Sequence, residues 1–547
     1  MTEWLLSGHN TQETTGVARP VTVTMTEGGL DAQISWFLGQ LAGDTWDFDQ
    51  TVKPTEVVQG RLYLNINYYA RNMGSVVPFD PESVGVPAHL VEESAEVPRE
   101  RLMRLPMRFR RTYRWAARFY RNVLPKIDRK LSDIYWKLRQ DPEDPLPLIW
   151  SLFEPKFYAQ TRDTDRAHIV IALTITTLDG ILHQRAPQLL SLFVGHETAT
   201  SQIGQRIWDL RQTAEECGAD VQHMLTDGTV ELEAYEALPT AAPLVAGVQA
   251  FLHRYGHRGF RYEADFETER LADRPEHVLL AVAGQLQESE PPQVRAEAAR
   301  QVARDALQQM NPLQRLIWKR VLRWGQQLIS WREDSKSSIA LRQAAYGLAA
   351  RHLARHFYPD QPDDVMMFYH LKEFLTFVRS RGGQRVDQST LNRRRAQFEL
   401  YRSQPPPPEL IYYDPLTQHW RPAMEEEKAQ PTAGLARLQG IAASAGRGLA
   451  EGIAVVTNDP LDAGRRLLEL EGPVVLVTRL TDPAWSSLFR RLSAVVTELG
   501  GVISHAAIVA RENGLPAVVG IPEATRRIRD GQRVRVDGAT GTVEVVQ

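Results

Sequence analysis

One histidine of this chain stands where the neighbouring residues could make it a nucleophile. His505 follows the turn-forming pair Gly500-Gly501 and the helix-capping residue Ser504, and a stretch with helical character then runs to Gly514. The spacing predicts a helix over 505–513 with the histidine in its first turn, because serine caps helices and glycine permits a tight turn. Free backbone N–H groups there favour an anion. A neutral imidazole in that place can attack phosphorus; the alternative is a histidine that only caps the helix.

Short strands must hold that turn and helix in place. After residue 435, small and β-branched residues dominate, in segments that alternate with helical ones. This alternation is typical of a compact α/β domain, so we expect residues 435–547 to form one. The predicted strands begin near Ile453, Pro473, Ala494, Ala517, Val534 and Thr542.

The chain before this domain is predicted to be mainly helical. From about 165 to 400, long segments without Pro or Gly carry apolar residues at helical spacing. Two earlier segments look different, because Val21–Met25 is β-prone and 61–69 alternates as a strand does. We therefore expect a mainly helical domain that binds substrate or acceptor over 1–420, followed by a polar hinge linker over 421–434.

The segment 99–139 is the most basic part of the chain, with 14 Lys and Arg residues against three acids. Aromatic residues lie between the charges, and the spacing is helical with a break near Pro125. One interpretation is a surface that docks an acidic partner or a nucleic acid. The alternative is an amphipathic helix whose arginine stems cover apolar surface while their charged ends stay in water.

Composition excludes several classes of protein. The chain has 547 residues, 64 of them basic and 67 acidic, so its net charge is −3 and the whole molecule is not a polycation. Its single cysteine, Cys217, excludes an intramolecular disulfide, a Cys-based zinc site and a CxxC redox motif. The sequence opens without a signal-peptide pattern, and no apolar window reaches the ~18–20 residues that cross a bilayer. We expect a cytoplasmic protein that does not bind a membrane.

The segment around His505 resembles the phosphohistidine swivelling domain of phosphoenolpyruvate-utilising enzymes. That domain has a Gly-Gly turn, a Ser/Thr/Cys-His-Ala-Ala stretch, then Ala-Arg and Gly-Leu/Ile-Pro-Ala. The matching residues here are Gly500, Gly501, Ser504, His505, Ala506, Ala507, Ala510, Arg511, Gly514, Pro516 and Ala517. The segments 440–446, 481–485 and 534–543 are similar to its opening, middle and last strands.

This resemblance implies a role for His505. In the family the histidine is phosphorylated from ATP: the β-phosphate ends on the ring, and AMP and phosphate are released. It implies in addition that the turn around the nucleophile holds the phosphate. The residues given this role are Gly500, Gly501, Ser504 and Arg511.

The helical part resembles a narrower group, the rifampicin phosphotransferases and related phosphoenolpyruvate synthase-like enzymes. Arg332 and Lys336 match the Arg-x-x-x-Lys pair of that group's substrate site. Four residues apart on a helix, they share one face, where two cations can neutralise charge on a transferring phosphoryl group. The alternative is a solvated pair. His257, Arg258 and Glu333 are further candidates for lining the substrate site, with a structural role as the alternative.

Two parts of these relatives have no counterpart in the sequence: the ATP-grasp domain and the phosphoenolpyruvate-binding barrel. There is no P-loop either. We expect ATP and Mg²⁺ to be bound by a separate ATP-grasp protein, as in the split arrangement of phenylphosphate synthase, with no cofactor held tightly by this chain. The pairs His253/His257 and His352/His356 have metal-ligand spacing, but no carboxylate motif supports them, so no metal site is predicted.

The sequence thus predicts a dikinase-type phosphotransferase component. The small domain would swing on its linker and present phospho-His505 to the helical domain, where a hydroxyl of a small organic molecule accepts the phosphoryl group. One alternative is a non-catalytic phosphocarrier or regulatory protein whose helical region binds a protein partner. Another is a nucleic-acid-binding chain that uses the basic segment, with a vestigial histidine domain.

Overall fold

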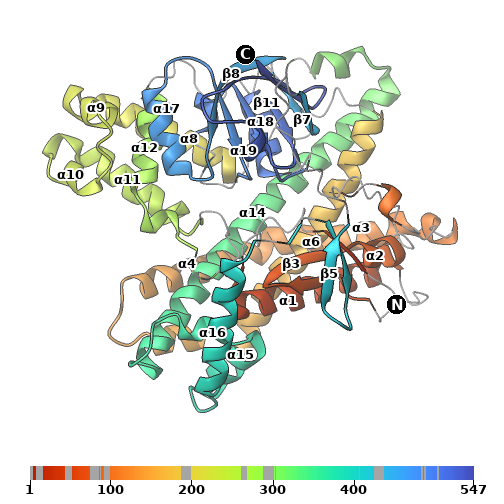
Figure 1. Cartoon of the computed structure of the whole chain (residues 1–547), viewed down its shortest axis with the longest axis vertical. Coiled ribbons are helices and arrows are strands. Elements are labelled where there is room, and N and C mark those ends of the chain that lie inside the picture. The colour runs from red at the N-terminus through yellow and green to blue at the C-terminus, as the bar shows by residue number, and fades with distance from the viewer. Residues whose placement is uncertain are drawn as a thin grey trace. The chain divides into compact units, whose positions relative to one another are not determined.

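A computed structural model describes most of the chain (Figure 1). The described residues are 4–7, 17–42, 52–73, 86, 88–91, 99–185, 199–259, 266, 268–286, 301, 304–405, 407–408, 410–423, 437–446, 448–481, 485, 488–501 and 504–546.

The chain divides into two compact units, each built from separate stretches of sequence. Unit 1 contains residues 1–173, 262–268 and 335–427, and unit 2 contains 174–261, 269–334 and 428–547. The helical region that precedes the α/β domain therefore contributes residues to both units. The predicted hinge, 421–434, lies almost wholly outside the described residues, which stop at Ala423 and resume at Arg437.

Unit 1 contains a small antiparallel sheet beside its helices. The strand order is β2-β3-β1-β4-β5, and β1 pairs with β4 through Leu6 and Ile411, so residues about 400 positions apart become neighbours (Figure 1, red beside cyan). The strands are β1 Trp4–Ser7, β2 Thr55–Val58, β3 Arg61–Asn65, β4 Leu410–Asp414 and β5 His419–Pro422.

Helices form the rest of unit 1. Its core contains a cluster of rings, in which Phe153 lies 4.7 Å from Tyr346 and 5.3 Å from Phe374 between centroids. A buried ion pair between Arg342 and Asp165 crosses the same core at 2.7 Å. The α-helices that lie wholly in unit 1 are α1 Pro20–Ala42, α2 Ile66–Tyr68, α3 Arg99–Asn122, α4 Leu124–Arg139, α5 Leu146–Leu152, α15 Leu371–Arg379 and α16 Gln388–Ser403. Two more, α6 Pro155–Arg185 and α14 Pro312–Phe357, contribute residues to both units.

Two local predictions in this unit were wrong. The β-prone segment Val21–Met25 lies inside α1, where the hydroxyl of Thr24 donates to the carbonyl of Pro20 at 2.8 Å. Such bonds let threonine fit a helix, and α1 packs against α3 and α15, so tertiary contacts outweigh the local strand propensity. The strand predicted over 61–69 ends at Asn65, because that side chain caps the short helix α2.

The helical part of unit 2 has its own apolar core. Its largest buried side chains include Tyr235, Phe251 and Tyr255, with Ile207 and Leu279 packed among them. The helices are α8 Ala199–Glu216, α9 Ala219–Thr226, α10 Leu232–Glu236, α11 Ala242–Tyr255 and α12 Glu276–Leu286.

The C-terminal part of unit 2 is the predicted small α/β domain. Its eight-stranded sheet has the order β6-β13-β12-β8-β9-β10-β11-β7, and the neighbours β8, β9, β10 and β11 run parallel. The strands are β6 Arg437–Gln439, β7 Ile441–Ala445, β8 Ala450–Val456, β9 Val474–Thr478, β10 Ala494–Thr497, β11 Pro516–Val519, β12 Arg533–Asp537 and β13 Thr542–Val546; the helices are α17 Pro460–Glu469, α18 His505–Asn513 and α19 Ala524–Arg527. All six predicted strands are present, and β6 and β7 were not predicted.

The two parts of unit 2 pack against each other. Helix α17 of the α/β domain lies along α12 (Figure 1, upper left), with Leu461 packed against Leu280 and Val230 in a buried apolar cluster. The guanidinium of Arg490 stacks over the ring of Trp208 on α8, 5.8 Å from its centroid. The fold class predicted from the sequence, a mainly helical region followed by a small α/β domain, is confirmed.

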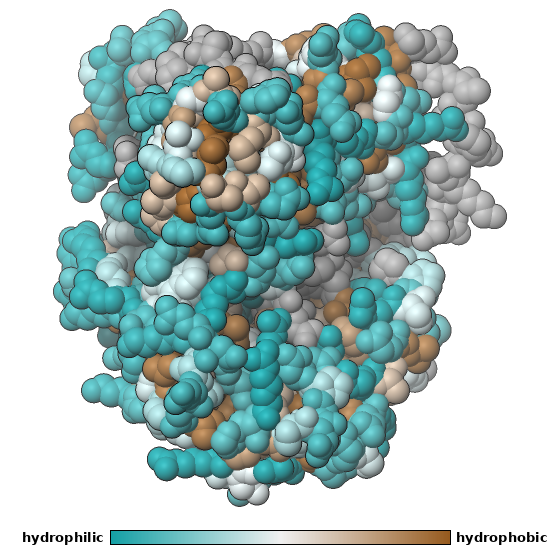
Figure 2. Space-filling view, turned by 90° about the vertical axis from the view of Figure 1, so that its left-hand side faces the viewer, coloured by the Kyte–Doolittle hydropathy of each residue, from teal (hydrophilic) through white to brown (hydrophobic). Residues whose placement is uncertain are grey.

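Polar side chains dominate the face drawn in Figure 2, and apolar residues form small separate groups there. The apolar residues named above are turned into the cores instead. Within the described ranges, no helix combines the length and the apolar character that crossing a membrane requires.

Candidate functional site

His505 begins helix α18, at the end of a turn that leaves the parallel strand β10. Gly500 in this turn has a φ of +129°, and a Cβ there would lie 2.9 Å from the Ser504 hydroxyl, so only glycine fits. The Gly501 carbonyl accepts from the Ser504 backbone N–H at 2.9 Å and closes the turn. The turn and the predicted histidine position at the helix start are therefore present.

Helix α18 has the predicted ends. The Ser504 hydroxyl accepts from the backbone N–H of Ala507 at 3.4 Å, and Gly514 ends the helix in the left-handed conformation with a φ of +64°. Ala506, Ala507 and Ala510 are buried against the sheet. These small side chains let the helix lie close to β11 and β7, which fixes where its N-terminus points.

Two side chains hold the half-buried imidazole of His505. Oγ1 of Thr481, a buried residue that follows β9, lies 3.0 Å from Nδ1 of the ring. The ring of Phe489 meets the imidazole edge-on, with centroids 6.1 Å apart and planes at 85°. The ring orientation is thus set from two sides, while part of the side chain remains accessible to solvent.

Neither contact was predicted from the sequence. Thr481 belongs to a segment that carries the family resemblance, which is the one signal that could have indicated it. Phe489 lies in a single 3₁₀ turn, Phe489–Arg491, and nothing in the local pattern connects it with a histidine 16 residues later.

Arg511, predicted to hold phosphate, lies two helical turns from His505. Its Nε donates to the carbonyl of Ala443 at 2.7 Å, which ties α18 to strand β7. This contact gives Arg511 a part in positioning the helix that carries the histidine.

The candidates on α14 lie together on one turn of that helix. Nη1 of Arg332 forms a 2.7 Å ion pair with Oε1 of Glu333, and both side chains are buried. Lys336 is half-buried and lies four residues beyond Arg332, about 6 Å by the helical rise. Asp334 was not predicted as a site residue. Burial and the neighbouring Glu333 charge raise its pKa to about 6.

His257 and Arg258 lie in the turn that follows α11, and both are buried. The His257 carbonyl accepts from Nη1 of Arg270 at 3.5 Å, and the Arg258 carbonyl accepts from the Leu271 backbone N–H at 2.8 Å. These backbone contacts fasten the turn to the segment before α12, which is a structural role for it. The predicted residues thus occupy three places: the α18 N-terminus, one turn of α14 and this turn.

In the part of the chain that the structure describes, no group of three or more His, Cys, Asp and Glu side chains could hold a metal ion. His352, one of the histidines with metal-ligand spacing, has its Nε2 at 2.9 Å from the Leu138 carbonyl.

Comparisons with known protein families agree with the geometry around His505. Residues 470–541 match the family described as "PEP-utilising enzyme, mobile domain", and residues 167–333 match "Rifampicin phosphotransferase fourth domain". The first match contains His505 and its turn, and the second contains helices α8 to α12 together with Arg332. Both resemblances predicted from the sequence are confirmed.

Particular relatives carry these names. A rifampicin phosphotransferase of Streptomyces sviceus is 33% identical over 320 residues, covering 55% of this chain and 34% of the relative. Another from Streptomyces sp is 32% identical over 369 residues, covering 64% and 40%. A phosphoenolpyruvate synthase of Aeropyrum pernix is 41% identical over 130 residues, covering 23% and 15%. The chain thus spans between a third and two fifths of the length of the two rifampicin phosphotransferases.

Proposed function

We propose that this chain is a phosphotransferase that works through a phosphohistidine at His505. The observation that carries the proposal is the placement of this imidazole. It begins a capped helix at the end of a parallel strand, and a buried threonine hydroxyl lies at its Nδ1. The matches to a mobile domain and to relatives named phosphotransferases support the same chemistry.

The Thr481 contact can select which ring nitrogen reacts. A neutral imidazole carries one proton, so one nitrogen donates and the other keeps its lone pair. When Nδ1–H donates to Thr481 Oγ1, the lone pair lies on Nε2. That atom attacks phosphorus, the bond from phosphorus to the leaving oxygen breaks, and the phosphoryl group remains on Nε2. Nδ1–H keeps its bond to the threonine and helps to stabilise the charged ring.

Transfer to the acceptor uses the turn of α14. The guanidinium of Arg332, held by Glu333, and the ammonium of Lys336 stabilise the negative charge that spreads over the phosphoryl oxygens. Asp334, with a pKa raised to about 6, is suited to take the proton of an acceptor hydroxyl near neutral pH. The acceptor oxygen bonds to phosphorus as the bond to Nε2 breaks, which returns neutral His505.

The phosphoryl donor is ATP with Mg²⁺, bound by an ATP-grasp protein that acts as a partner. The small α/β domain carries the phosphoryl group from this donor to the acceptor, a hydroxyl of a small organic molecule. The segment 421–434 serves as the hinge for this movement.

The test is incubation of the full chain with the ATP-grasp partner and ATP labelled in its β-phosphate. Wild-type chain should acquire an acid-labile, alkali-stable label, and His505→Ala should acquire none. His253→Ala, which changes an exposed histidine on α11, is the matched control and should be labelled normally. Label that persists in His505→Ala would overturn the proposal.

A second donor makes the test independent of the partner. Phosphoramidate phosphorylates histidine directly, and ³¹P NMR distinguishes the two ring positions. The proposal expects phosphorus on Nε2 of His505. Label on the isolated phosphorylated chain should then pass to a small molecule, whereas transfer to a protein alone would support the phosphocarrier alternative.

A further inference from the structure

Helix α3 presents a group of arginines for which the proposed phosphotransfer has no use. The helix contains nine arginines, one glutamate and no lysine. Four of the arginines line a cavity of about 520 Å³ together with one indole ring. The lining residues are Arg110, Arg111, Arg114, Trp115 and Arg118.

These four guanidinium groups line one cavity, and no carboxylate of a described residue forms an ion pair with any of them. All four arginines are exposed, and none forms an ion pair or a hydrogen bond with a described residue. Arg110, Arg114 and Arg118 follow one another at four-residue spacing, so about 6 Å of helix separates each from the next on one face. Four positive charges held this close repel one another, and an anion placed among them would relieve that repulsion.

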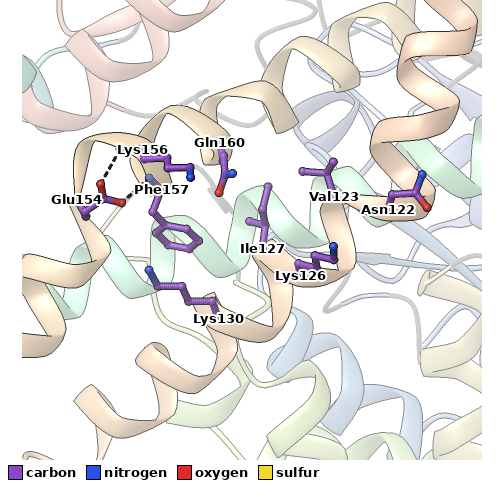
Figure 3. A pocket seen from close by; sticks show the side chains of 9 residues that line it. All are labelled: Asn122, Val123, Lys126, Ile127, Lys130, Glu154, Lys156, Phe157 and Gln160. Carbon is purple, nitrogen blue, oxygen red and sulfur yellow. Dashed lines mark hydrogen bonds between the residues drawn. The ribbon is translucent and has the colours of Figure 1, made fainter.

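Another basic cavity of unit 1 shows what a partnered arrangement looks like (Figure 3). Between α4 and α6, Lys130 lies over the ring of Phe157, 3.9 Å from its centroid. The carboxylate of Glu154 lines the same cavity and accepts from the backbone N–H of Phe157 at 2.9 Å. A lysine there already has an aromatic partner and a negative charge nearby, whereas the four arginines that line the α3 cavity have no carboxylate or carbonyl of a described residue bound to them.

The cavity has a firm aromatic wall. The ring of Trp115 stacks on Phe119 with centroids 5.9 Å apart and planes at 25°. On another side it contacts Trp36 of α1, with centroids 5.3 Å apart. Neighbouring rings therefore hold the indole in place, so the arginines surround a fixed surface.

We propose that this cavity binds a polyphosphate chain, such as that of a nucleoside triphosphate or inorganic tripolyphosphate. A guanidinium group can bind phosphate through two parallel hydrogen bonds. All the basic residues of α3 are arginines, and this favours phosphate as the ligand. Four positive charges balance the four negative charges of a fully ionised nucleoside triphosphate, and 520 Å³ lies within the usual range for small-ligand sites. A site confined to about two turns of one helix suits such an anion better than a nucleic acid, whose backbone needs a long track of contacts. The inference does not depend on His505.

The test is isothermal titration calorimetry of the full chain with tripolyphosphate, ATP, AMP and inorganic phosphate, each at low and at high salt. We expect tripolyphosphate and ATP to bind at least tenfold more tightly than inorganic phosphate, with affinity that falls as salt rises. Tighter binding of ATP than of tripolyphosphate would show that the base contributes, and equal binding that the phosphates alone are recognised; both support the proposal.

Two variants and a matched control locate the site. Arg114→Gln and Arg118→Gln should each weaken tripolyphosphate binding about tenfold or more. Arg129→Gln, which changes an exposed arginine of α4 outside the cavity, should leave it unchanged. Unchanged thermal denaturation would show that the variants fold.

Three results would overturn the proposal. They are an absence of tripolyphosphate binding at millimolar concentration, equal effects of the α3 and Arg129 variants, and displacement of tripolyphosphate by a single-stranded oligonucleotide that binds more tightly. The last result would make α3 a nucleic-acid surface instead.

Discussion

Oγ1 of Thr481 lies 3.0 Å from Nδ1 of His505, and this contact joins the segment after β9 to the start of α18. A hydroxyl in this place can select the ring tautomer whose lone pair lies on Nε2. The contact is thus the structural basis for the reactivity that we assign to this histidine.

Removal of the hydroxyl should slow phosphorylation. Thr481→Val keeps the shape of the side chain but offers no partner to Nδ1–H, so both tautomers become populated and the ring is held less firmly. We expect about tenfold slower phosphorylation of His505, the effect of one hydrogen bond of about 1.4 kcal/mol. Thr481→Ser should restore most of the rate, and ¹⁵N NMR of the ring should report the change of tautomer. Equal rates for all three chains would remove Thr481 from this role.

The turn offers a matched pair of glycine variants. Gly500→Ala forces an alanine to a φ of +129° with its Cβ 2.9 Å from the Ser504 hydroxyl, so it should destabilise the domain by at least about 1 kcal/mol and impair phosphorylation. Gly501→Ala meets no atom within 4 Å and should leave the stability of the domain unchanged. Denaturant unfolding and the labelling assay measure both effects. Equal losses in the two variants would contradict the requirement for glycine at residue 500.

Two variants of Ser504, which caps α18, should change the unfolding free energy and the rate of phosphorylation independently of each other. Ser504→Ala removes the acceptor for the Ala507 N–H and should cost about 1 kcal/mol of unfolding free energy. Ser504→Asp restores a capping oxygen but places a negative charge beside the entering phosphoryl group. We expect it to unfold like the wild type and to be phosphorylated more slowly. Rapid phosphorylation of Ser504→Asp would show that the phosphoryl group does not approach this end of the helix.

A test of the role of Arg332 requires a variant that also removes the charge of Glu333, the other member of the buried ion pair. Arg332→Gln alone removes one member of the buried ion pair with Glu333, a loss that costs about 3–5 kcal/mol. The double variant Arg332→Gln/Glu333→Gln removes both charges and should regain most of that stability. It should still form phospho-His505 but transfer it slowly. Wild-type turnover in the double variant would show that the guanidinium takes no part.

Acid should weaken unit 2 through His277 on α12. Burial lowers its pKa to about 4 from an ordinary value of 6.5, with Asp459 acting in the opposite direction. Between pH 7 and 4 the unfolded chain therefore binds a proton that the folded chain does not, and stability falls as the pH falls. Thermal denaturation against pH should show this loss. His277→Gln should flatten the profile, His253→Gln should not, and an unchanged slope in His277→Gln would refute the assignment.

The sequence predicted the histidine helix to its terminal residues, because both ends depend on local chemistry. Ser504 caps α18 and Gly514 ends it, and these residue types have strong positional preferences. Four of the six predicted strands of the α/β domain, β8 to β11, were equally visible, since buried parallel strands form continuous β-branched runs.

Contacts between residues far apart in the sequence could not be predicted from the sequence. The pairing of Leu6 with Ile411 depends on packing between distant segments, and Val21–Met25 became helical against its local propensity. The same holds at the site: nothing in the spacing showed that Thr481 and Phe489 would meet His505. Arg511 had the expected position on α18, but its bond to the Ala443 carbonyl became visible only in three dimensions.

The first and last strands of the eight-stranded sheet, β6 and β7, are separated in sequence by Gly440 alone. A sheet joined in this way across its two ends resists shearing, so we expect the domain to move as one rigid body in the proposed transfer. The same domain contains the residues that contact or position the imidazole of His505, namely Thr481, Phe489 and Ser504. In the proposed transfer, the contacts that orient the imidazole therefore accompany it to both donor and acceptor, and neither needs to supply them.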